Sequence, residues 1–449
     1  MTTTSHGTHQ IPPDPTVTGR LTSDAAALRD HTARIEDLLG DLPARPDRSP
    51  GQQRRAAELH RVARQGRTAF LRAHAATVYE RLPDGLRLPE LTEAASQEFP
   101  GLAPTAQQMA AEAQLLQAYK EGREIDQGIL LRELLRLPEP GTRIIEAMQR
   151  PTEWALGLQS EFARTGCVEL ASAHLERRDA IGHITIHNED SLNAEDNRLV
   201  ADLETVVDLV LLDEGTRVGV LRGAPMTHPR YAGRRVFSAG INLKHLHQGR
   251  ISYVNFLMGR EIGLINKLLR GILLAPDGSP SERVVEKPWL AAVDTFAIGG
   301  GMQLLLVLDR VLTADDAYFS LPAAQEGIVP GAANLRLSRV LGERLAKQVI
   351  LGGRVIRATD PEARLLCDEV LAPEALDEQI TRSATQLAVP SVVPNRRMLN
   401  LAIEPLDEFR TYMAEFALTQ AIRLYSQDVA DKVGEFSTKA QSTKGAPEP

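Results

Sequence analysis

The sequence predicts an α/β protein in which a strand-rich central part is flanked by helical segments. Three observations predict this class. Apolar residues recur at spacings of three and four through residues 21–137, which is the pattern of amphipathic helices. After Cys167, short alternating or wholly apolar stretches take turns with helical ones, as is typical of α/β proteins. Beyond about Pro390 the helical pattern returns.

The predicted elements follow in chain order. Helices are expected in DAAALRDHTARIEDLLGDL, RRAAELHRVARQGRTAFLRAHAATVYERL and TAQQMAAEAQLLQAYKEGREIDQGILLRELLRL, with breaks near prolines. The stretches CVELAS, AIGHITIHN and TRVGVLRGA are expected strands, and ETVVDLVLLDEG between the last two is helical. LLAPDGSPSERVVEKP is a loop of turn-forming residues. WLAAVDTFAIGGG, DRVLTADDAYFSLP and VIRATDPEARLLCDEVLAP continue the alternation.

Five parts are expected along the chain. They are a disordered tail at 1–20, a helical N-terminal domain at 21–170, an α/β catalytic core at 171–390, C-terminal helices at 391–436 and a polar tail at 437–449. The first tail is polar and rich in proline, a composition that cannot bury a core. The N-terminal domain contains no chemical motif, and its paired charges, such as Glu121 and Arg123, are interpreted as a solvated face.

Composition limits the classes of partner. The chain has 449 residues, 43% hydrophobic and 24% charged, which is ordinary for a globular protein. Its net charge of −8 gives no general attraction to nucleic acid or to anionic membranes. Cys167 and Cys367 are the two cysteines, too few for a disulfide framework or a cysteine metal cluster. With no signal-peptide pattern and no apolar run of about 20 residues, we expect a cytoplasmic protein that binds neither nucleic acid nor membrane.

Two small-residue turns draw attention, VFSAGINLKH at 236–245 and AIGGGMQLLLVLD at 297–309. Glycines at a helix start leave N–H groups free and let a ligand approach the backbone. Two such turns facing each other could donate one N–H each to a single carbonyl oxygen, forming an oxyanion hole. Each turn alone is better interpreted as a tight connection or a close-packing site. The GGG stretch does not fit a phosphate loop, since it lacks GxGxxG spacing and a following Lys-Ser/Thr.

Together and in this order, the two turns resemble the crotonase (enoyl-CoA hydratase/isomerase) superfamily. The resemblance runs from about Ala180 to Pro390 and is carried by VFSAGINLKHL, by EKPWLAAVDTFAIGGGMQLLLVLDRVLTADDAYFSLP and by EGIVPGAANLRLSRVLG. It implies a crotonase-like spiral of ββα units, an acyl-CoA substrate whose carbonyl becomes an enolate, and oxyanion-hole amides at Ile241 and Gly300. It also implies a homo-oligomer, a trimer or dimer of trimers, with helices in 409–436 suited to the interface.

The chain departs from hydratases of that superfamily at two positions. Hydratases carry glutamate in GGGxE, where this chain has Gln303, and a second glutamate after a proline, where Ala323 follows Pro322. Without both carboxylates, hydration by that mechanism is not expected. The Gln303 amide can donate and accept hydrogen bonds, which suits a phenol hydroxyl.

Further features resemble one branch of the superfamily, the dioxygenases that use neither metal nor flavin. These features are the long helical N-terminus, the insertion THPRYAGRR and the segment GINLKHLHQGRISYVNFLMGREIG. The resemblance implies that 3,5-dihydroxyphenylacetyl-CoA and O2 become 3,5-dihydroxyphenylglyoxylate and CoA, in the synthesis of an antibiotic precursor. No cofactor is expected, and CoA is part of the substrate. Glu195, Arg260 and Gln303 are then positioned to hold the dihydroxyphenyl ring.

Other residues are weaker candidates. Leu243 and Ile328 are candidate walls of an O2 pocket, or simply core residues, and Asn242 is grouped with them as a substrate contact. His228 is a candidate polar contact to the thioester or to CoA. Because CoA is anionic, local cations are needed. The candidates are Arg234, Arg235 and Lys244, with Arg177 and Arg178 nearby in the sequence.

Three alternatives stay open at the level of sequence. An iron site could use His187 and Glu189 with His228 or His245, but the pattern is common by chance and no metal site is expected. A second alternative is another acyl-CoA enzyme of the same fold, such as a thioesterase, isomerase or decarboxylase. The third is a non-catalytic scaffold or RNA-binding protein, which the net charge of −8 disfavours. No residue is identified as the base that removes the α-proton.

Overall fold

The structure is a computed structural model that describes residues 11–274, 283–429 and 431–432. The predicted polar tail at 437–449 and the first half of the predicted disordered tail lie outside the described residues. In the second half of that tail, residues 11–20 have no helix or strand. Near the end of this stretch, Thr18 donates from its backbone and its hydroxyl to the Asp24 carboxylate at 2.7–3.1 Å. The disorder expected for residues 1–20 stays a prediction.

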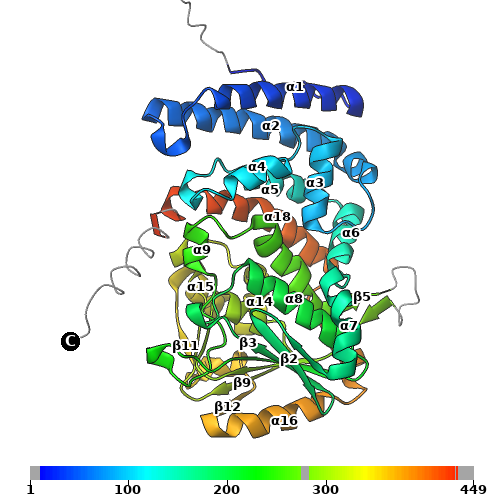
Figure 1. Ribbon diagram of the computed structural model, residues 1–449, viewed down its shortest axis with the longest axis vertical. Coiled ribbons are helices and arrows are strands. Elements are labelled where there is room, and N and C mark those ends of the chain that lie inside the picture. Colours follow the sequence, from blue (N-terminus) through cyan, green and yellow to red (C-terminus); the bar gives the residue numbers. More distant parts are fainter. Residues whose placement is uncertain (1–10, 275–282, 430, 433–449) are drawn as a thin grey trace, which may run out of the picture.

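The N-terminal part is helical, as the periodicity predicts. Helices α1 and α2 lie side by side at one end of the molecule (Figure 1). Helix α2 begins where the sequence supplies a capping box, since Ser49 and Gln52 exchange side-chain and backbone hydrogen bonds and Pro50 follows the cap. The elements are α1 (Leu21–Gly40), η1 (Arg45–Asp47), α2 (Pro50–Arg81), α3 (Leu88–Glu98), α4 (Ala106–Glu112), η2 (Gln117–Tyr119), α5 (Arg123–Leu135), α6 (Pro138–Gln149) and α7 (Glu153–Thr165).

The central sheet has seven strands in the order β1-β2-β3-β4-β7-β9-β12. The first three strands are antiparallel and the rest are parallel. Strand β7 reads WLAAV and is buried throughout, as expected for a parallel strand covered on both faces. The bounds are β1 (Cys167–Glu169), β2 (Ala173–Arg178), β3 (Ile181–Ile186), β4 (Val218–Gly223), β7 (Trp289–Val293), β9 (Arg310–Ala314) and β12 (Glu369–Leu371).

Helices cover both faces of this sheet. Helix α8 packs on β2, β3 and β4, and helix α16 packs on β4, β7 and β9 from the outer side (Figure 1). The predicted α/β class is thereby confirmed, whereas the exact division into domains stays a prediction. The helical elements of this region are α8 (Asn197–Leu212), α9 (Leu243–His247), η5 (Tyr253–Met258), η6 (Arg260–Ile265), α10 (Asn266–Arg270), α12 (Gly300–Leu305), α13 (Ala323–Glu326), α14 (Ala333–Leu341), α15 (Glu343–Gly352) and α16 (Leu376–Leu387), with short turns η3 (Glu189–Ser191), η4 (Pro229–Tyr231), η7 (Pro361–Leu365) and η8 (Pro373–Ala375).

A smaller sheet supports the second glycine turn. Its three strands are β11 (Ile356–Arg357), β10 (Tyr318–Ser320) and β8 (Phe296–Ile298), in that order. Strand β8 leads directly into the glycines at 299–301. Most of the segment predicted as a loop of turn formers, residues 275–282, lies outside the described residues. At its two ends the structure has a short antiparallel pair, β5 (Ile272–Leu273) and β6 (Val284–Val285), so β6 is a strand within the predicted loop.

The C-terminal segment expected to suit an oligomer interface is largely buried within the chain. Helix α18 (Leu406–Leu424) packs against α5, and it buries Phe409, Met413 and Phe416 in the main hydrophobic core. Its apolar face is thus used inside the chain, because the N-terminal helices cover it. Several exposed apolar side chains lie together on α17 (Val392–Ile403), where Met398 is 66% exposed and Leu399 is 61% exposed.

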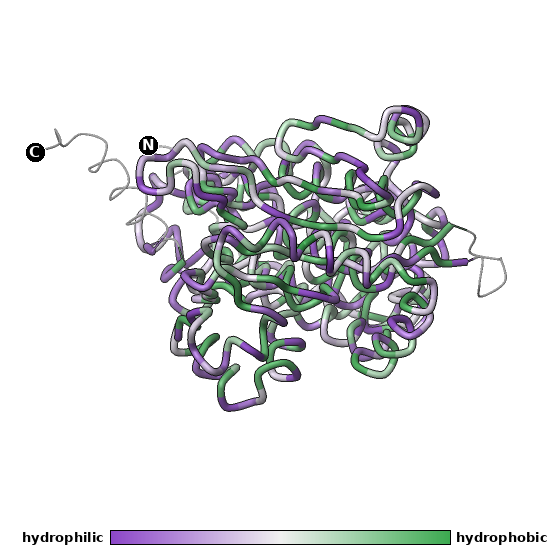
Figure 2. Tube along the Cα trace, turned by 90° about the horizontal axis from the view of Figure 1, so that it is seen from below, coloured by the Kyte–Doolittle hydropathy of each residue, from purple (hydrophilic) through white to green (hydrophobic). Residues whose placement is uncertain are grey.

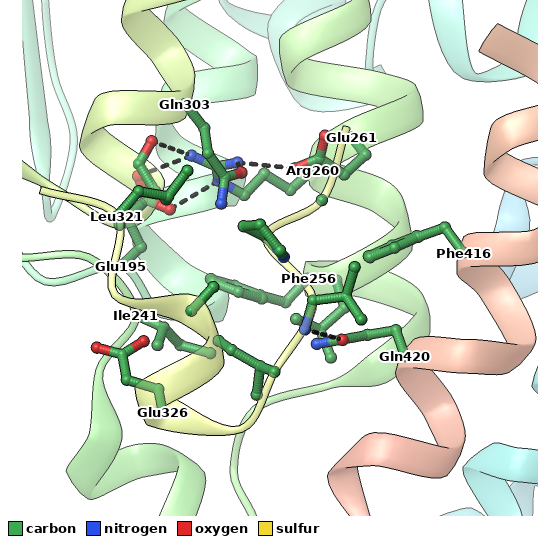
Figure 3. Close-up of a pocket in the computed structure, with 18 residues that line it drawn as sticks. Glu195, Ile241, Phe256, Arg260, Glu261, Gln303, Leu321, Glu326, Phe416 and Gln420 are labelled. Atoms are coloured by element: carbon green, nitrogen blue, oxygen red, sulfur yellow. Dashed lines mark hydrogen bonds and ion pairs between the residues drawn. The ribbon is translucent and has the colours of Figure 1, made fainter. Parts of the chain in front are cut away.

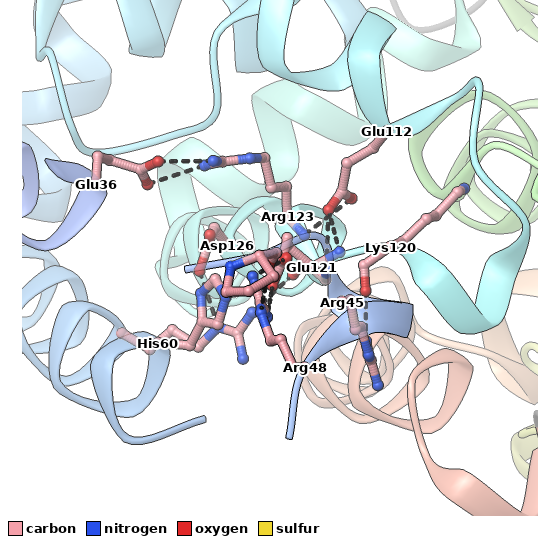
Figure 4. Close-up of polar contacts among 12 residues, drawn as sticks. Glu36, Arg45, Arg48, His60, Glu112, Lys120, Glu121, Arg123 and Asp126 are labelled. Carbon is pink, nitrogen blue, oxygen red and sulfur yellow. Dashed lines mark hydrogen bonds and ion pairs between the residues drawn. The ribbon is translucent and has the colours of Figure 1, made fainter. Parts of the chain in front are cut away.

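A network of charged side chains joins the N-terminal helices to α5 (Figure 4). Glu121 accepts from His60 at 3.0 Å and from Arg48 at 2.6 Å, and Arg123 pairs with Glu36 at 2.6 Å. Burial alone would raise the pKa of Glu121, but these donors outweigh it and lower that pKa to about 2. The interpretation of Glu121 and Arg123 as a solvated face is therefore wrong, because packing of α1 and α2 on α5 brings distant partners to them.

Hydropathy changes repeatedly along the chain trace between hydrophilic and hydrophobic residues (Figure 2). Within the described residues, we find no helix that combines the length and the apolar character needed to cross a membrane.

Candidate active site

Strand pairing brings the two glycine turns together. Ser238, just before the first turn, forms a parallel bridge with Ala297, just before the second. The Ile298 N–H donates to the Ser238 carbonyl oxygen at 2.9 Å. Two parallel segments that pair in this way deliver their next residues to the same end, so both turns open at one place.

The turns are in backbone contact, and glycine is required for it. Gly240 has φ +85° and Gly299 has φ +54°, conformations that favour glycine. A Cβ atom built on Gly299 would lie 3.2 Å from the Gly240 Cα and 4.0 Å from the Ile241 nitrogen. Neither the Ile241 N–H nor the Gly300 N–H donates to another described residue. Two neighbouring, unused amides are what an oxyanion hole needs, and their assignment to that role stays a prediction.

A buried guanidinium organises the floor of the site. Arg260 contacts Glu195 through Nε at 2.7 Å and through Nη2 at 3.0 Å, and its Nη1 contacts Gln303 Oε1 at 2.9 Å. Nη1 also contacts Glu261 at 2.9 Å, and Nη2 donates to the Gly300 carbonyl at 2.7 Å. Burial alone would lower the pKa of Arg260, but the carboxylates raise it. The Nη1 and Nη2 hydrogen bonds and the Nε ion pair hold the Glu195 and Gln303 side chains in fixed positions.

These residues line one pocket with a cavity volume of about 50 Å³ (Figure 3). Of the residues singled out in the sequence, the pocket is lined by Glu195, Ile241, Arg260, Gly300, Gln303 and Ile328. Ala323, at the position of the second hydratase glutamate, is also in the wall.

Other lining residues were not identified from the sequence. Phe256, Leu257 and Glu261 come from η5 and η6, which are π-helices, a geometry often found at functional sites. Phe416 comes from α18 and Gln420 beside it accepts from the Val329 N–H at 2.9 Å. No local pattern marks residues of α18, because only tertiary packing brings that helix to the site.

Glu326, at the end of α13, is a third carboxylate in the wall of the pocket. Burial raises the pKa of Glu326 to about 7. Its position could have been read from the sequence, since it follows Ala323 by three residues and so lies on the same side of one helical turn.

Three predicted substrate contacts lie outside the pocket wall. Asn242 is buried and caps α9 by accepting from the His245 N–H at 3.1 Å. Leu243 is partly buried against the main core. His228 is exposed and accepts from the Arg230 N–H at 3.3 Å. Asn242 has a capping role and Leu243 a packing role in this structure. Their assignment as substrate contacts stays a prediction, as does a contact of His228 with CoA.

The predicted CoA-binding cations also lie outside the pocket. Arg234 is exposed and pairs with Asp316 at 2.6 Å, and Arg235 donates to the Gly223 carbonyl at 3.0 Å. Lys244 is exposed on α9, directly after the first turn. Their role in holding CoA phosphates stays a prediction.

The histidines weighed for an iron site are engaged separately. His187 Nε2 lies 3.0 Å from Glu169, and His245 Nδ1 lies 3.1 Å from Asp196. In the part of the chain that the structure describes, no three His, Cys, Asp or Glu side chains come together in a way that could hold one metal ion.

Comparison with known proteins adds to this geometry. The enoyl-CoA hydratase/isomerase family matches residues 280–413. A (3,5-dihydroxyphenyl)acetyl-CoA 1,2-dioxygenase of Amycolatopsis orientalis is 56% identical over 418 residues, covering 92% of this chain and 96% of that protein. A probable enoyl-CoA hydratase of Rhizobium meliloti is 26% identical over 234 residues, covering 51% of this chain and 81% of that protein.

Among solved structures, an enoyl-CoA hydratase/isomerase from Pseudoalteromonas atlantica has a TM-score of 0.49 at 22% identity, covering 62% of this chain and 99% of that one. The stronger statement comes from sequence, because the Amycolatopsis relative is 56% identical along nearly the whole chain and the family match includes the second glycine turn. The chain belongs to the enoyl-CoA hydratase/isomerase (crotonase) family.

Proposed function

We propose that this chain is a dioxygenase that converts (3,5-dihydroxyphenyl)acetyl-CoA and O2 into 3,5-dihydroxyphenylglyoxylate and CoA, using neither metal nor flavin. The identity to the Amycolatopsis enzyme supports the substrate. The observation that supports the chemistry is the backbone contact between the two glycine turns, next to which the Ile241 and Gly300 amides donate to no other described residue.

The site suits an aryl-stabilised enolate. Loss of an α-proton leaves the electron pair in the enolate, and the negative oxygen accepts hydrogen bonds from the Ile241 and Gly300 amides. Preorganised donors of this kind each contribute about 3–4 kcal/mol to a developing oxyanion. Glu195 and Gln303 then hold the ring hydroxyls, because Arg260 fixes both of their side chains.

The enolate itself is the reductant of O2. It transfers one electron to O2, and the resulting radical pair combines to an α-peroxide. The terminal peroxide oxygen attacks the thioester carbonyl and expels the CoA thiolate. The O–O bond then breaks as the second α-hydrogen leaves as a proton, giving the α-keto acid. The apolar side chains of Phe256, Ile328 and Phe416 give O2 a wall without hydrogen-bonding groups.

An oxygen electrode tests this function directly. With (3,5-dihydroxyphenyl)acetyl-CoA, after exhaustive chelation and removal of flavin, we expect O2 uptake matched by CoA release. CoA release without O2 uptake would instead favour another acyl-CoA enzyme of the fold, and neither signal would favour a scaffold. Loss of uptake on chelation that returns with iron would overturn the cofactor-independent mechanism.

We also infer a homo-oligomer, a trimer or dimer of trimers, with the exposed apolar side chains of α17 in its interface. Light scattering after gel filtration measures the mass. A monomer at micromolar concentration would contradict this inference. The cytoplasmic location expected from the sequence stays a prediction.

A further inference from the structure

The second hydratase glutamate is absent from this chain, yet a carboxylate lies one helical turn further along. Ala323 and Glu326 are the first and last residues of α13, and both line the pocket. Residues three apart on a helix are neighbours on one face. Because the Ala323 side chain ends at Cβ, it leaves space beside the longer side chain of Glu326. Figure 3 shows the Glu326 side chain beside Ile241, whose amide is assigned to the oxyanion hole.

Glu326 differs from the other carboxylates of the pocket because its side chain has no hydrogen-bond or ion-pair partner among the described residues. Glu195 receives two contacts from Arg260. Glu261 accepts from Arg260 at 2.9 Å and from the Ala332 N–H at 3.0 Å. No hydrogen bond or ion pair joins the Glu326 carboxylate to another described residue. Of the three, Glu326 is thus the one whose lone pairs are available to a substrate.

Two cations that reach the backbone beside Glu326 do not pair with its carboxylate. Arg423 of α18 donates to the Gly327 carbonyl at 2.7 Å and pairs with Asp428 at 2.5 Å. Lys432 donates to the Ala324 carbonyl at 3.4 Å. On the pocket side, Arg260 forms ion pairs with Glu195 and Glu261. With no cation at its own carboxylate, Glu326 has a pKa raised by burial to about 7. A carboxylate that exchanges protons near neutral pH is suited to general-base catalysis.

We propose that the Glu326 carboxylate removes the α-proton of the bound arylacetyl thioester. This rests on the proposed function and adds the base that it needs. The proton moves to a Glu326 carboxylate oxygen, and the C–H electron pair becomes the enolate double bond as the carbonyl oxygen takes the negative charge. Glu326 later returns its proton to the CoA thiolate, which needs one on leaving.

Proton exchange without O2 tests this step apart from oxygenation. The wild-type protein and substrate are mixed in D2O under anaerobic conditions, and deuterium at the α-carbon is followed by mass spectrometry against the non-enzymatic rate. We expect enzymatic exchange in the wild type and at least about a 100-fold loss in Glu326→Gln, the usual range for a general base. The matched control is Glu374→Gln, which removes an exposed carboxylate on η8 and keeps the wild-type rate.

Two further measurements separate a catalytic from a structural role. In the wild type, kcat/KM is expected to rise as the pH increases through about 7. In Glu326→Gln this pH dependence is expected to disappear. Glu326→Ala is expected to regain exchange in proportion to added formate, which a misfolded protein does not do. The proposal is overturned if folded Glu326→Gln exchanges the α-proton at the wild-type rate, or if formate does not restore exchange in Glu326→Ala. In either case, O2 uptake by the wild type still supports the function. A wild type that neither exchanges nor takes up O2 overturns the function itself.

Discussion

Nη2 of Arg260 lies 2.7 Å from the Gly300 carbonyl oxygen and 3.0 Å from Glu195 Oε1. One buried cation therefore ties the second glycine turn to the carboxylate assigned to the substrate ring. The position of the Gly300 amide and the orientation of Glu195 are coupled, so a change in one is expected to disturb the other.

Replacing this cation tests the coupling. In Arg260→Lys the charge remains, but a lysine ammonium cannot span Glu195, Glu261 and Gln303 at once. We expect kcat/KM for O2 uptake to fall roughly 100-fold, as when reacting groups are misplaced by about 1 Å. Steady-state kinetics and thermal unfolding measure the effect.

The control for this change is Arg382→Lys, an exposed arginine that pairs with Glu378 on α16. It is expected to leave both activity and thermal unfolding unchanged. Full activity in Arg260→Lys would show that the guanidinium does not organise the site.

Gln303→Glu restores the residue that hydratases carry in GGGxE. The new carboxylate can still accept from Arg260, but it loses the amide donor and adds negative charge beside Glu195 and Glu261. Loss of one hydrogen bond of about 1–3 kcal/mol predicts roughly a 10- to 100-fold fall in O2 uptake. No hydration of a short 2-enoyl-CoA is expected, because Ala323 supplies no second carboxylate.

Oxygen uptake and absorbance of the enoyl thioester measure the two activities. Gln325→Glu, an exposed change on the same helical turn as Ala323, is the control and should behave as wild type. Hydration by Gln303→Glu alone would disprove the need for two carboxylates.

Gly300→Ala tests the close approach of the turn to Glu195. A Cβ atom there would lie 2.2 Å from Glu195 Oε2, and Glu195 cannot move freely since Arg260 holds both of its oxygens. The turn must shift, and losing one oxyanion donor predicts a fall of about 100- to 1,000-fold in kcat.

The matched change is Gly51→Ala in α2, where a Cβ atom meets nothing within 4 Å. It should leave kcat unchanged. A Gly300→Ala protein with wild-type kcat would mean that this amide does not bind the enolate oxygen.

Acid sensitivity is expected from Glu404. Burial alone would raise the pKa of Glu404, but Arg336 at 2.8 Å and Arg270 at 2.9 Å lower it from 4.5 to about 2. Because the pKa of Glu404 is lower in the folded than in the unfolded protein, its ionised carboxylate stabilises the folded state above pH 4.5. This stabilisation is lost as the pH falls towards 2. The loss amounts to about 3 kcal/mol in the free energy of unfolding.

Urea unfolding between pH 7 and pH 3 measures this loss. Glu404→Gln is expected to be less stable at pH 7 and to show a shallower decrease below pH 4.5. Glu378→Gln, whose side chain is 80% exposed, should follow the wild-type curve. An unchanged acid slope in Glu404→Gln would place the acid sensitivity elsewhere.

The local chemistry of the site could be predicted from the sequence. The glycines of the two turns, the amide at Gln303 and the alanine at Ala323 are visible in order along the chain, and glycine's freedom at positive φ is a property of the residue itself. The helical and strand periodicities likewise predicted the α/β class, because side-chain spacing reflects which face is buried.

Only the tertiary structure decided which of these residues meet. The 56% identity to the Amycolatopsis enzyme establishes the family, but the pairing of Ser238 with Ala297, the five contacts of Arg260 and the burial of α18 depend on packing between segments far apart in the chain. The same packing gives Asn242 a capping role and leaves Glu326 in the pocket wall without a partner among the described residues. A carboxylate's pKa and partners are set by what surrounds it in space, and sequence spacing does not contain that information.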